Sequence, residues 1–262
     1  MTATLAPSRR LLPARRLGTP PAGASPPNAT IAERLDLGPT MARFSIAPDG
    51  GVPAFAPGQY FAIGLERDGR LIQRPYSAAS QARDPVLEFA IRLVPEGALT
   101  PALWTLRPGA RVRIGPPKGL FRLADGDHLT SLLLATGTGI APLVAMARAL
   151  WSEPVPRRTI VVHGVGRADE LAYRRELAAW SASMAGWVYV PVISRPGDAV
   201  NAGWSGRVGR LDTIVPSLID ELGLDPEATV AYLCGNPAMI AGLAPRLIDL
   251  GLPASAVRSE AY

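Results

Sequence analysis

Cysteine is almost absent from this chain of 262 residues, in which Cys234 is the only one. A single cysteine excludes an intramolecular disulfide and an iron–sulfur cluster held by thiolates of this chain, and it fits a reducing, intracellular setting. No run approaches about 18 consecutive apolar residues, and the N-terminus lacks the apolar stretch and cleavage pattern of a secretory signal. We therefore expect a cytoplasmic protein with no membrane span and no metal site.

Acidic residues are missing from residues 1–32, which hold four arginines, six prolines and no aromatic residue. Such a segment buries too little apolar surface to offset an ordering cost of about 1–2 kcal/mol per residue, so it predicts a flexible or loosely docked arm. The rest of the chain contains 23 of the 27 basic residues and all 22 acidic residues. Most of the net charge of +5 therefore lies in the arm, and no nucleic-acid partner is expected. An organelle transit peptide has a similar composition, but the preference for arginine continues downstream, where Lys118 is the only lysine.

Residues 33–124 consist of short apolar segments separated by proline and glycine. Segments 59–63, 86–94 and 111–114 are typical of strands, and the turn signals between them occur at intervals that suit antiparallel pairing. This part of the chain is predicted to form a small barrel or sandwich.

Residues 125–262 have a different pattern, in which apolar strands alternate with helical stretches. The predicted strands are 129–135, 159–163, 188–193, 229–233 and 256–260. Strands that are apolar on both faces and separated by helices build a doubly wound parallel sheet.

Two helices of this second part are predicted from their sequence patterns. After Pro142, apolar side chains recur at helical spacing up to Trp151. Asp169 is predicted to cap a helix that runs through Trp180.

The segment 132–142 predicts a nucleotide-binding turn, because a buried strand runs into Gly137-Thr138-Gly139 and then into a helix. Two glycines let the backbone approach a diphosphate, and the helix N-terminus offers free N–H groups. Pro142 occupies the place of the third glycine of the dinucleotide fingerprint, so an ordinary tight turn is the alternative.

Ser194 and Arg195 follow a predicted strand, and Arg207 follows the next loop. Arginine binds phosphate in a bidentate, charge-assisted way, so this group favours NADP over NAD, with solvated surface arginines as the alternative. Cys234 also stands at a strand end, where ligands bind in such sheets. As a nucleophile it lacks a partner placed by any motif, and a small buried side chain is its simplest interpretation.

Six motifs appear in the order and spacing of the ferredoxin/flavodoxin–NADP reductase family, and the chain resembles the bacterial type over about residues 35–262. The motifs are Pro-Gly-Gln-Tyr at 57–60, Arg-Pro-Tyr-Ser at 74–77, Val-Pro-Glu-Gly-Ala-Leu-Thr at 94–100, Pro-Lys-Gly-Leu-Phe at 117–121, Gly-Thr-Gly-Ile-Ala-Pro at 137–142 and Cys-Gly-Asn-Pro-Ala-Met at 234–239. The resemblance implies a six-stranded antiparallel FAD-binding β-barrel over 33–124 and an NADP-binding α/β domain over 125–262.

By this resemblance the cofactor-binding residues form two sets. The FAD set is Arg74, Pro75, Tyr76, Ser77, Ile91, Arg92, Leu93, Ala98, Leu99, Thr100, Thr138 and Tyr262. The NADP set is Thr138, Gly139, Arg167, Ser194, Arg195, Arg207, Gly235, Asn236 and Met239.

The chain ends in Glu260-Ala261-Tyr262, which resembles the Glu-x-Tyr terminus of the plastid-type enzymes. The resemblance implies that Tyr262 covers the flavin face on which nicotinamide must stack, and that Ser77, Cys234 and Glu260 surround the hydride path. From position alone, a frayed chain end is the alternative for Tyr262.

The resemblance implies a monomeric enzyme that passes a hydride between NADPH and FAD, and single electrons between FAD and a small acidic ferredoxin or flavodoxin. The alternatives are the reductase component of an oxygenase, an NAD(P)H-dependent flavin or ferric reductase, and a regulatory module that binds flavin or nucleotide without catalysis.

Overall fold

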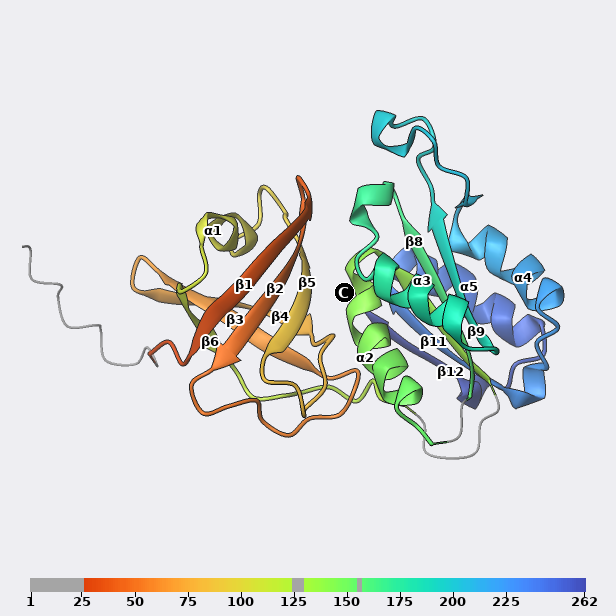
Figure 1. Cartoon of the computed structure of the whole chain (residues 1–262), viewed down its shortest axis with the longest axis horizontal. Helices are drawn as coiled ribbons and strands as arrows, with labels where there is room; N and C mark the ends of the chain where they lie inside the picture. Colours follow the sequence, from red (N-terminus) through yellow and green to blue (C-terminus); the bar gives the residue numbers. More distant parts are fainter. Residues whose placement is uncertain (1–25, 124–129, 155–156) are drawn as a thin grey trace, which may run out of the picture.

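The computed structural model describes residues 26–123, 130–154 and 157–262, which form two domains side by side (Figure 1). Each domain holds a six-stranded sheet, antiparallel in the first and parallel in the second. The predicted fold class is confirmed. None of the helices in the described part of the chain combines the length and apolar character needed to cross a membrane.

The first domain is an antiparallel barrel with the strand order β4-β3-β6-β1-β2-β5. Phe44, Phe61 and Phe89 are fully buried in its core, and the rings of Phe61 and Phe89 meet edge to face with 6.2 Å between their centroids. A six-residue helix, α1 (Thr100–Thr105), follows β5. The strands are β1 (Ala29–Gly38), β2 (Met41–Pro48), β3 (Tyr60–Arg67), β4 (Arg70–Ser77), β5 (Leu87–Arg92) and β6 (Arg111–Ile114).

The barrel begins earlier than the predicted boundary at residue 33. Strand β1 starts at Ala29, and the side chains of Ala29 and Ile31 are fully buried in the barrel core. The Asn28 amide pairs with both backbone groups of Ile114, at 3.0 Å and 2.8 Å, and so fixes the entry of the chain. Residues 29–32 therefore belong to the barrel, and residues 1–25 of the predicted arm lie outside the described residues.

The second domain is a parallel sheet with helices on both faces (Figure 1). Its strand order is β10-β9-β8-β7-β11-β12. The strands are β7 (Thr130–Thr136), β8 (Arg158–Val165), β9 (Trp187–Ile193), β10 (Arg207–Val208), β11 (Thr229–Gly235) and β12 (Val257–Ala261). The α-helices are α2 (Ile140–Trp151), α3 (Arg174–Ser183), α4 (Leu211–Glu221) and α5 (Pro237–Asp249).

Successive strand residues pack against different helices, which explains why these strands are apolar throughout. Leu133 packs in the cluster that contains α2 and α3, whereas Leu132 and Leu134 pack in the cluster that contains α4 and α5. Burial on both faces is the usual condition of a parallel sheet.

The predicted helix after Pro142 is α2, but its buried surface is wider than one face. Val144 and Ala145 are fully buried as well as the predicted Leu143 and Met146. The reason is that α2 lies between the sheet and the barrel (Figure 1), where Ala79, Ala90 and Phe121 of the barrel share one apolar cluster with it.

The predicted helix cap at Asp169 is wrong. Asp169 lies in a short 3₁₀ turn, η2 (Ala168–Glu170), and its carboxylate accepts a hydrogen bond of 2.7 Å from Arg167. The α-helix begins only at Arg174, because Tyr173 interrupts the chain in the left-handed conformation with φ of 64°. Asp169 stands five residues before the first residue of α3 and is therefore not at its N-cap position, which Tyr173 occupies.

Candidate functional site

A cavity of about 690 Å³ opens between the two domains and is called here the interdomain cavity. Volumes of this order are typical of sites for small molecules and cofactors. The barrel contributes β4, β5 and the turn that leads into α1, and the second domain contributes the glycine turn after β7, the start of α2 and the ends of β11 and β12. The lining residues are Arg74, Pro75, Tyr76, Ser77, Ala90, Arg92, Val94, Glu96, Gly97, Ala98, Leu99, Thr100, Thr138, Gly139, Ala141, Pro142, Cys234, Glu260, Ala261 and Tyr262.

Strand β4 brings Arg74, Tyr76 and Ser77 to one wall of this cavity. Burial raises the pKa of Tyr76 to about 12, although the nearby Arg74 opposes the shift, so the phenol stays neutral. In the described part of the chain Arg74 forms no ion pair, and its guanidinium donates only to the carbonyl of Gln73, at 2.8 Å. An arginine without a carboxylate partner remains available to an anionic ligand.

Strand β5 presents alternate side chains to the cavity. Ala90, Arg92 and Val94 line it, whereas Ile91 is only 1% exposed in the barrel core and Leu93 is not among the lining residues. The side chains of Ile91 and Leu93 therefore do not line the cavity, and their contact with a flavin stays a prediction. Because side chains alternate along a strand, Ile91 and Leu93 point away from the face that Arg92 shares.

The turn from Val94 to Thr100 forms a backbone cradle at the same wall. The Thr100 hydroxyl accepts from the Val94 N–H at 2.9 Å and donates to the Val94 carbonyl at 3.1 Å. A Cβ at Gly97 would lie 2.9 Å from the Val94 oxygen, so the turn requires glycine. Arg74, the Tyr76 ring and this cradle fit a ligand with a diphosphate and a planar ring system, as FAD has.

The Gly-Thr-Gly turn follows β7 and leads into α2. A Cβ at Gly139 would lie 2.2 Å from the Cys234 carbonyl oxygen, so only glycine permits this close approach to the end of β11. The buried His163 ring holds the turn from below, with its Nε2 atom 2.9 Å from the Gly137 carbonyl oxygen. Burial lowers the pKa of His163 to about 4, so the ring is neutral and Nε2–H donates this bond.

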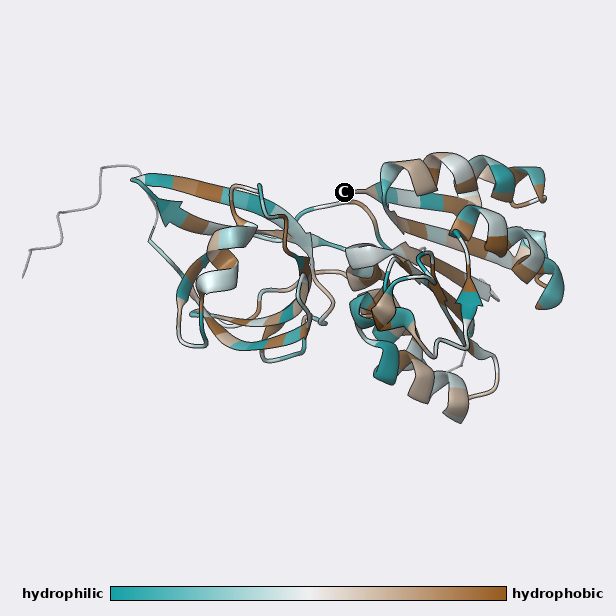
Figure 2. Ribbon diagram, turned by 90° about the horizontal axis from the view of Figure 1, so that it is seen from above, coloured by the Kyte–Doolittle hydropathy of each residue, from teal (hydrophilic) through white to brown (hydrophobic). Residues whose placement is uncertain are grey.

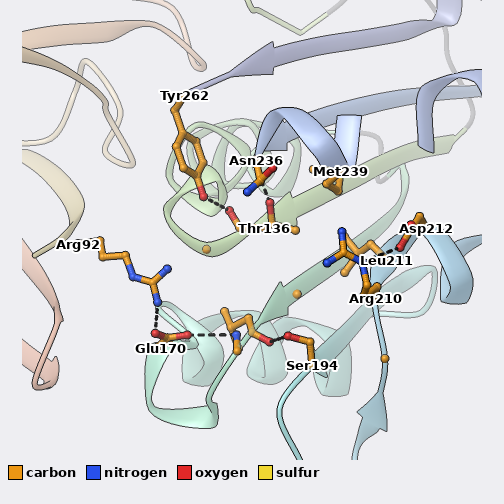
Figure 3. A pocket seen from close by; sticks show the side chains of 15 residues that line it. Arg92, Thr136, Glu170, Ser194, Arg210, Leu211, Asp212, Asn236, Met239 and Tyr262 are labelled. Carbon is orange, nitrogen blue, oxygen red and sulfur yellow. Dashed lines mark hydrogen bonds and ion pairs between the residues drawn. The ribbon is translucent and has the colours of Figure 1, made fainter. Parts of the chain in front are cut away.

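A smaller pocket of about 180 Å³ lies at the carboxyl ends of the parallel strands and is called here the nucleotide groove (Figure 3). Such an edge is where open α/β sheets bind their ligands. Its lining residues are Arg92, Thr136, Gly137, Gly164, Val165, Gly166, Glu170, Ser194, Gly209, Arg210, Leu211, Asp212, Asn236, Met239 and Tyr262.

The structure places some of the predicted NADP residues in this groove. Ser194, Asn236 and Met239 line it, while Thr138 and Gly139 line the interdomain cavity instead. Gly235 lies beneath the groove, where a Cβ would come 2.0 Å from the Thr136 hydroxyl oxygen.

The predicted arginines lie outside the lining of the groove in this structure. Arg167 pairs with Asp169 at 2.7 Å, and Arg207 pairs with Glu221 on the exposed side of β10. Arg195 is exposed, and its backbone N–H donates to the Gly166 carbonyl at 3.2 Å.

Arg210 lines the groove instead and was missed by the sequence reasoning. It stands directly before α4, three residues after Arg207, with its Nε 3.4 Å from the Asp212 carboxylate. Arg210 stands at the start of a helix in the same glycine-rich loop as Arg207, and this position could have identified it as a candidate phosphate ligand.

Tyr262 lies where the cavity and the groove meet, because it lines both of them. Its hydroxyl donates to the Thr136 carbonyl at 3.0 Å (Figure 3), and a Cβ at Gly137 would lie 2.9 Å from that hydroxyl. Pairing of β12 with β11 extends to Ala261 opposite Gly235, so the chain end is held in the sheet. This arrangement disagrees with the alternative of a frayed terminus.

The four predicted catalytic residues Ser77, Cys234, Glu260 and Tyr262 all line the interdomain cavity. Cys234 and Glu260 are opposite each other in the β11–β12 register. Burial, reinforced by the neighbouring Glu260, raises the pKa of the Cys234 thiol, and burial also raises the pKa of Glu260. Both shifts favour the protonated, uncharged groups, which disfavours a thiolate nucleophile.

Among the described residues, no three His, Cys, Asp or Glu side chains gather as metal ligands would.

Two family models match the chain, one for each domain. The oxidoreductase FAD-binding domain matches residues 29–123, and the oxidoreductase NAD-binding domain matches residues 133–244. The chain thus has an FAD-binding and an NAD(P)-binding domain, at the positions of the cavity and the groove.

The chain is also similar to whole proteins of known type. It is 32% identical over 246 residues to ferredoxin–NADP reductase B of Sorangium cellulosum, a match that covers 91% of this chain and 98% of that protein. It is 32% identical over 208 residues to the flavodoxin/ferredoxin–NADP reductase of Escherichia coli, covering 77% and 82% of the two chains.

Among solved structures, that of the Amycolatopsis cytochrome P450 reductase GcoB is similar with a TM-score of 0.77 and 28% identity, over 90% of this chain and 69% of that one. The two sequence relatives carry the assignment, and the motifs and the fold agree with it. The chain belongs to the ferredoxin/flavodoxin–NADP reductase family.

Proposed function

We propose that the protein oxidises NADPH by hydride transfer to FAD in the interdomain cavity and delivers the electrons singly to a small acidic ferredoxin or flavodoxin. The observation that carries the proposal is that cavity and groove share Arg92 and Tyr262. A flavin in one and a nicotinamide nucleotide in the other would therefore meet beside Tyr262.

Bound FAD supplies the conversion of one hydride transfer into two single-electron transfers. The chain supplies alignment and the exclusion of water. Ser77, Cys234 and Glu260 would surround the reacting edge with polar side chains, and burial raises the pKa of both the thiol and the carboxyl. Such a wall positions the nicotinamide without competing for the hydride.

Tyr262 is proposed to act as a gate. Its ring lies at the junction, and its hydroxyl donates a hydrogen bond to the Thr136 carbonyl. Nicotinamide can enter only if this ring moves, so Tyr262 weakens nucleotide binding and speeds product release. Tyr262→Ser should therefore bind NADP⁺ more tightly, by about 10-fold or more if one aromatic contact and its hydrogen bond are removed. An unchanged dissociation constant would refute the gate.

Ser194 and Arg210 are proposed to take the 2′-phosphate of NADPH at the far end of the groove. Arg195 is exposed and stays a candidate ligand, whereas Arg207 contributes only if it leaves Glu221, to which it is paired here. The test compares kcat/KM for NADPH and NADH in Arg210→Ala and in the double variant Arg195→Ala with Arg207→Ala. The variant that loses NADPH activity while keeping NADH activity identifies the phosphate ligands, and equal losses for both coenzymes refute the assignment.

A shallow depression lined by Leu120, Arg122 and Arg258 is proposed as the docking site of the electron acceptor. It shares Glu260 with the interdomain cavity, and Leu120 is 91% exposed. An exposed apolar side chain between two arginines suits a small acidic protein, since charge steers the encounter and apolar contact stabilises it. Arg122→Glu with Arg258→Glu should raise KM for such a carrier about 10-fold or more at low salt and leave ferricyanide reduction unchanged.

The proposed function is tested with purified full-length protein. It should be yellow with bound FAD, reduce ferricyanide with NADPH far faster than with NADH, and reduce cytochrome c only when ferredoxin or flavodoxin is added. Bound FAD without any NADPH-dependent reduction would instead support the non-catalytic alternative.

A second candidate is the reductase component of an oxygenase system. The similarity to the Amycolatopsis cytochrome P450 reductase favours it. In that case a ferredoxin of an oxygenase system, rather than a general ferredoxin or flavodoxin, would give the lowest KM in a panel of acceptors.

A further inference from the structure

An ion pair joins the two domains at the mouth of the nucleotide groove. The Arg92 guanidinium of β5 contacts the Glu170 carboxylate of η2 (Figure 3), and the two side chains are 48% and 7% exposed. Among the described residues that line the groove, Arg92 alone comes from the barrel domain. The pair therefore spans the gap that a nucleotide reaching the flavin has to cross.

Glu170 is held as a fixed anion. Its Oε2 atom accepts the backbone N–H groups of Gly166 at 3.1 Å and of Arg167 at 3.2 Å, while Oε1 contacts Arg92. Two backbone donors and a guanidinium are the partners that phosphate oxygens find in nucleotide sites. The Glu170 carboxylate thus accepts from a set of donors that would also suit a phosphate.

The charged residues that line the groove are two arginines and two carboxylates. Arg92 is paired with Glu170, and Arg210, which lies on the opposite side of the groove (Figure 3), stands 3.4 Å from Asp212. The phosphate groups of a nucleotide would bring more negative charge between Arg92 and Arg210. The two arginines would then have a stronger partner than their present carboxylates. Arg92 is 48% exposed, whereas Glu170 is 7% exposed and is also held by two backbone N–H groups, so an exchange of partners requires Arg92 to move.

We propose that Glu170 is an internal competitor for Arg92. Glu170 holds the guanidinium in this structure, and when a pyridine nucleotide binds, the guanidinium moves from Glu170 to the diphosphate. Arg92 then strengthens binding, whereas Glu170 weakens it and favours release of the product. The proposal rests on the proposed function, because the nucleotide has to bind in this groove.

The two roles give opposite signs in a binding experiment on the full-length, FAD-loaded protein. Glu170→Gln keeps an oxygen for the Gly166 and Arg167 N–H groups and removes the charge that holds Arg92. We expect it to lower the Kd for NADP⁺, measured by isothermal titration calorimetry, about 3–5-fold, as for an ion pair partly open to water.

Arg92→Met should raise the same Kd about 10–100-fold, since it removes charge-assisted hydrogen bonds to the diphosphate. The double variant of Arg92→Met with Glu170→Gln should match Arg92→Met alone, because a competitor has no effect once its target is gone. Arg107→Met, which removes an exposed charge of the barrel outside both pockets, is the matched control and should leave the Kd unchanged.

Adenosine 2′-monophosphate provides the ligand control, because it carries the 2′-phosphate and no diphosphate. Its Kd should stay the same in Arg92→Met, a comparison that holds even if Glu170→Gln does not fold. Were the pair only a latch between the domains, both single variants would shift the Kd for NADP⁺ in one direction, and that result overturns the proposal. Wild-type protein that fails to bind NADP⁺ refutes the proposed function itself, whereas normal wild-type binding with an unchanged or raised Kd in Glu170→Gln refutes only the exchange of Arg92.

Discussion

Arg148 of α2 is the centre of a charged network that fixes the two domains against each other. Its guanidinium donates to both carboxylate oxygens of Glu176 at 2.8 Å, to the Ala79 carbonyl at 2.8 Å and to Glu88 at 3.0 Å. Ala79 and Glu88 belong to the barrel, whereas Glu176 belongs to α3. Burial opposes the charge, but the bonds to Glu176 and the charges of Glu88 and Glu176 outweigh it and raise the pKa of Arg148.

The Arg148→Met variant keeps most of the apolar volume and removes every one of these bonds. It leaves two carboxylates that are only 16% and 27% exposed, as well as the buried Ala79 carbonyl, without their donor. Breaking a buried ion pair on one side costs about 3–5 kcal/mol, and partial water access favours the lower end. At about 2–4 °C per kcal/mol for a chain of this size, about 3 kcal/mol corresponds to roughly 6–12 °C in Tm.

Urea denaturation followed by tryptophan fluorescence measures this loss. Trp151 stacks on Trp180 with 5.1 Å between ring centroids, so the emission reports on α2 and α3. Arg83→Met is the matched control, because Arg83 also reaches across the domains, to the Ser152 hydroxyl at 2.7 Å, but is exposed. The control should lie within about 0.5 kcal/mol of wild type.

Adding Glu176→Gln to Arg148→Met should restore part of the stability, because the Glu176 carboxylate is then no longer left without a partner, whereas Glu88 keeps Arg43 at 3.9 Å. A loss below about 1 kcal/mol in Arg148→Met would refute the reasoning, since a surface ion pair accounts for that much. A combined variant less stable than Arg148→Met would refute it as well.

Three further predictions concern titratable groups of the site. The pKa of His163 is about 4 in the folded state and 6.5 in the unfolded chain, so the unfolded chain takes up a proton first as the pH falls. Wild type should therefore lose about 2 kcal/mol of stability between pH 7 and pH 5. Urea titrations of His163→Gln should lack this pH dependence. Burial raises the pKa of Glu260, so its contribution to stability is fully present below pH 4.5, where the carboxyl is protonated in both states, and is lost as the pH rises. The stability of Glu260→Gln relative to wild type should therefore increase from pH 4.5 to pH 7. A difference that stays constant with pH would contradict this. The buried Cys234 thiol should react with iodoacetamide on the order of 100-fold more slowly in the folded than in the urea-unfolded protein, and equal rates would show that the thiol is accessible.

The strands of the second domain were largely predictable from sequence. The predicted segments 159–163 and 229–233 lie inside β8 and β11, because continuous apolar runs between helices leave few other arrangements. The sequence motifs were also predictable, because each is a short continuous segment. Ser77, Cys234, Glu260 and Tyr262, which the resemblance placed near one another, all line the interdomain cavity.

The failures have a common physical cause, which is that a side chain's partner is set by the fold around it. Asp169 has the sequence of a helix cap, but Tyr173 adopts a left-handed conformation and the helix begins only at Arg174. Arg207 has the position of a phosphate ligand, yet Glu221, which approaches from α4, holds it on the surface.

The sequence by itself determined the two domains, the glycine turn and the residue types of a flavin and nucleotide site, because these depend on local pattern and order. Tertiary structure alone decided which arginines face the groove, since Arg210 lines it while Arg207 is paired elsewhere. It also decided that Arg92 meets Glu170 from the other domain. Contacts between residues 78 positions apart depend on how the domains dock, and that docking follows from burial around α2 and Arg148 rather than from any local pattern.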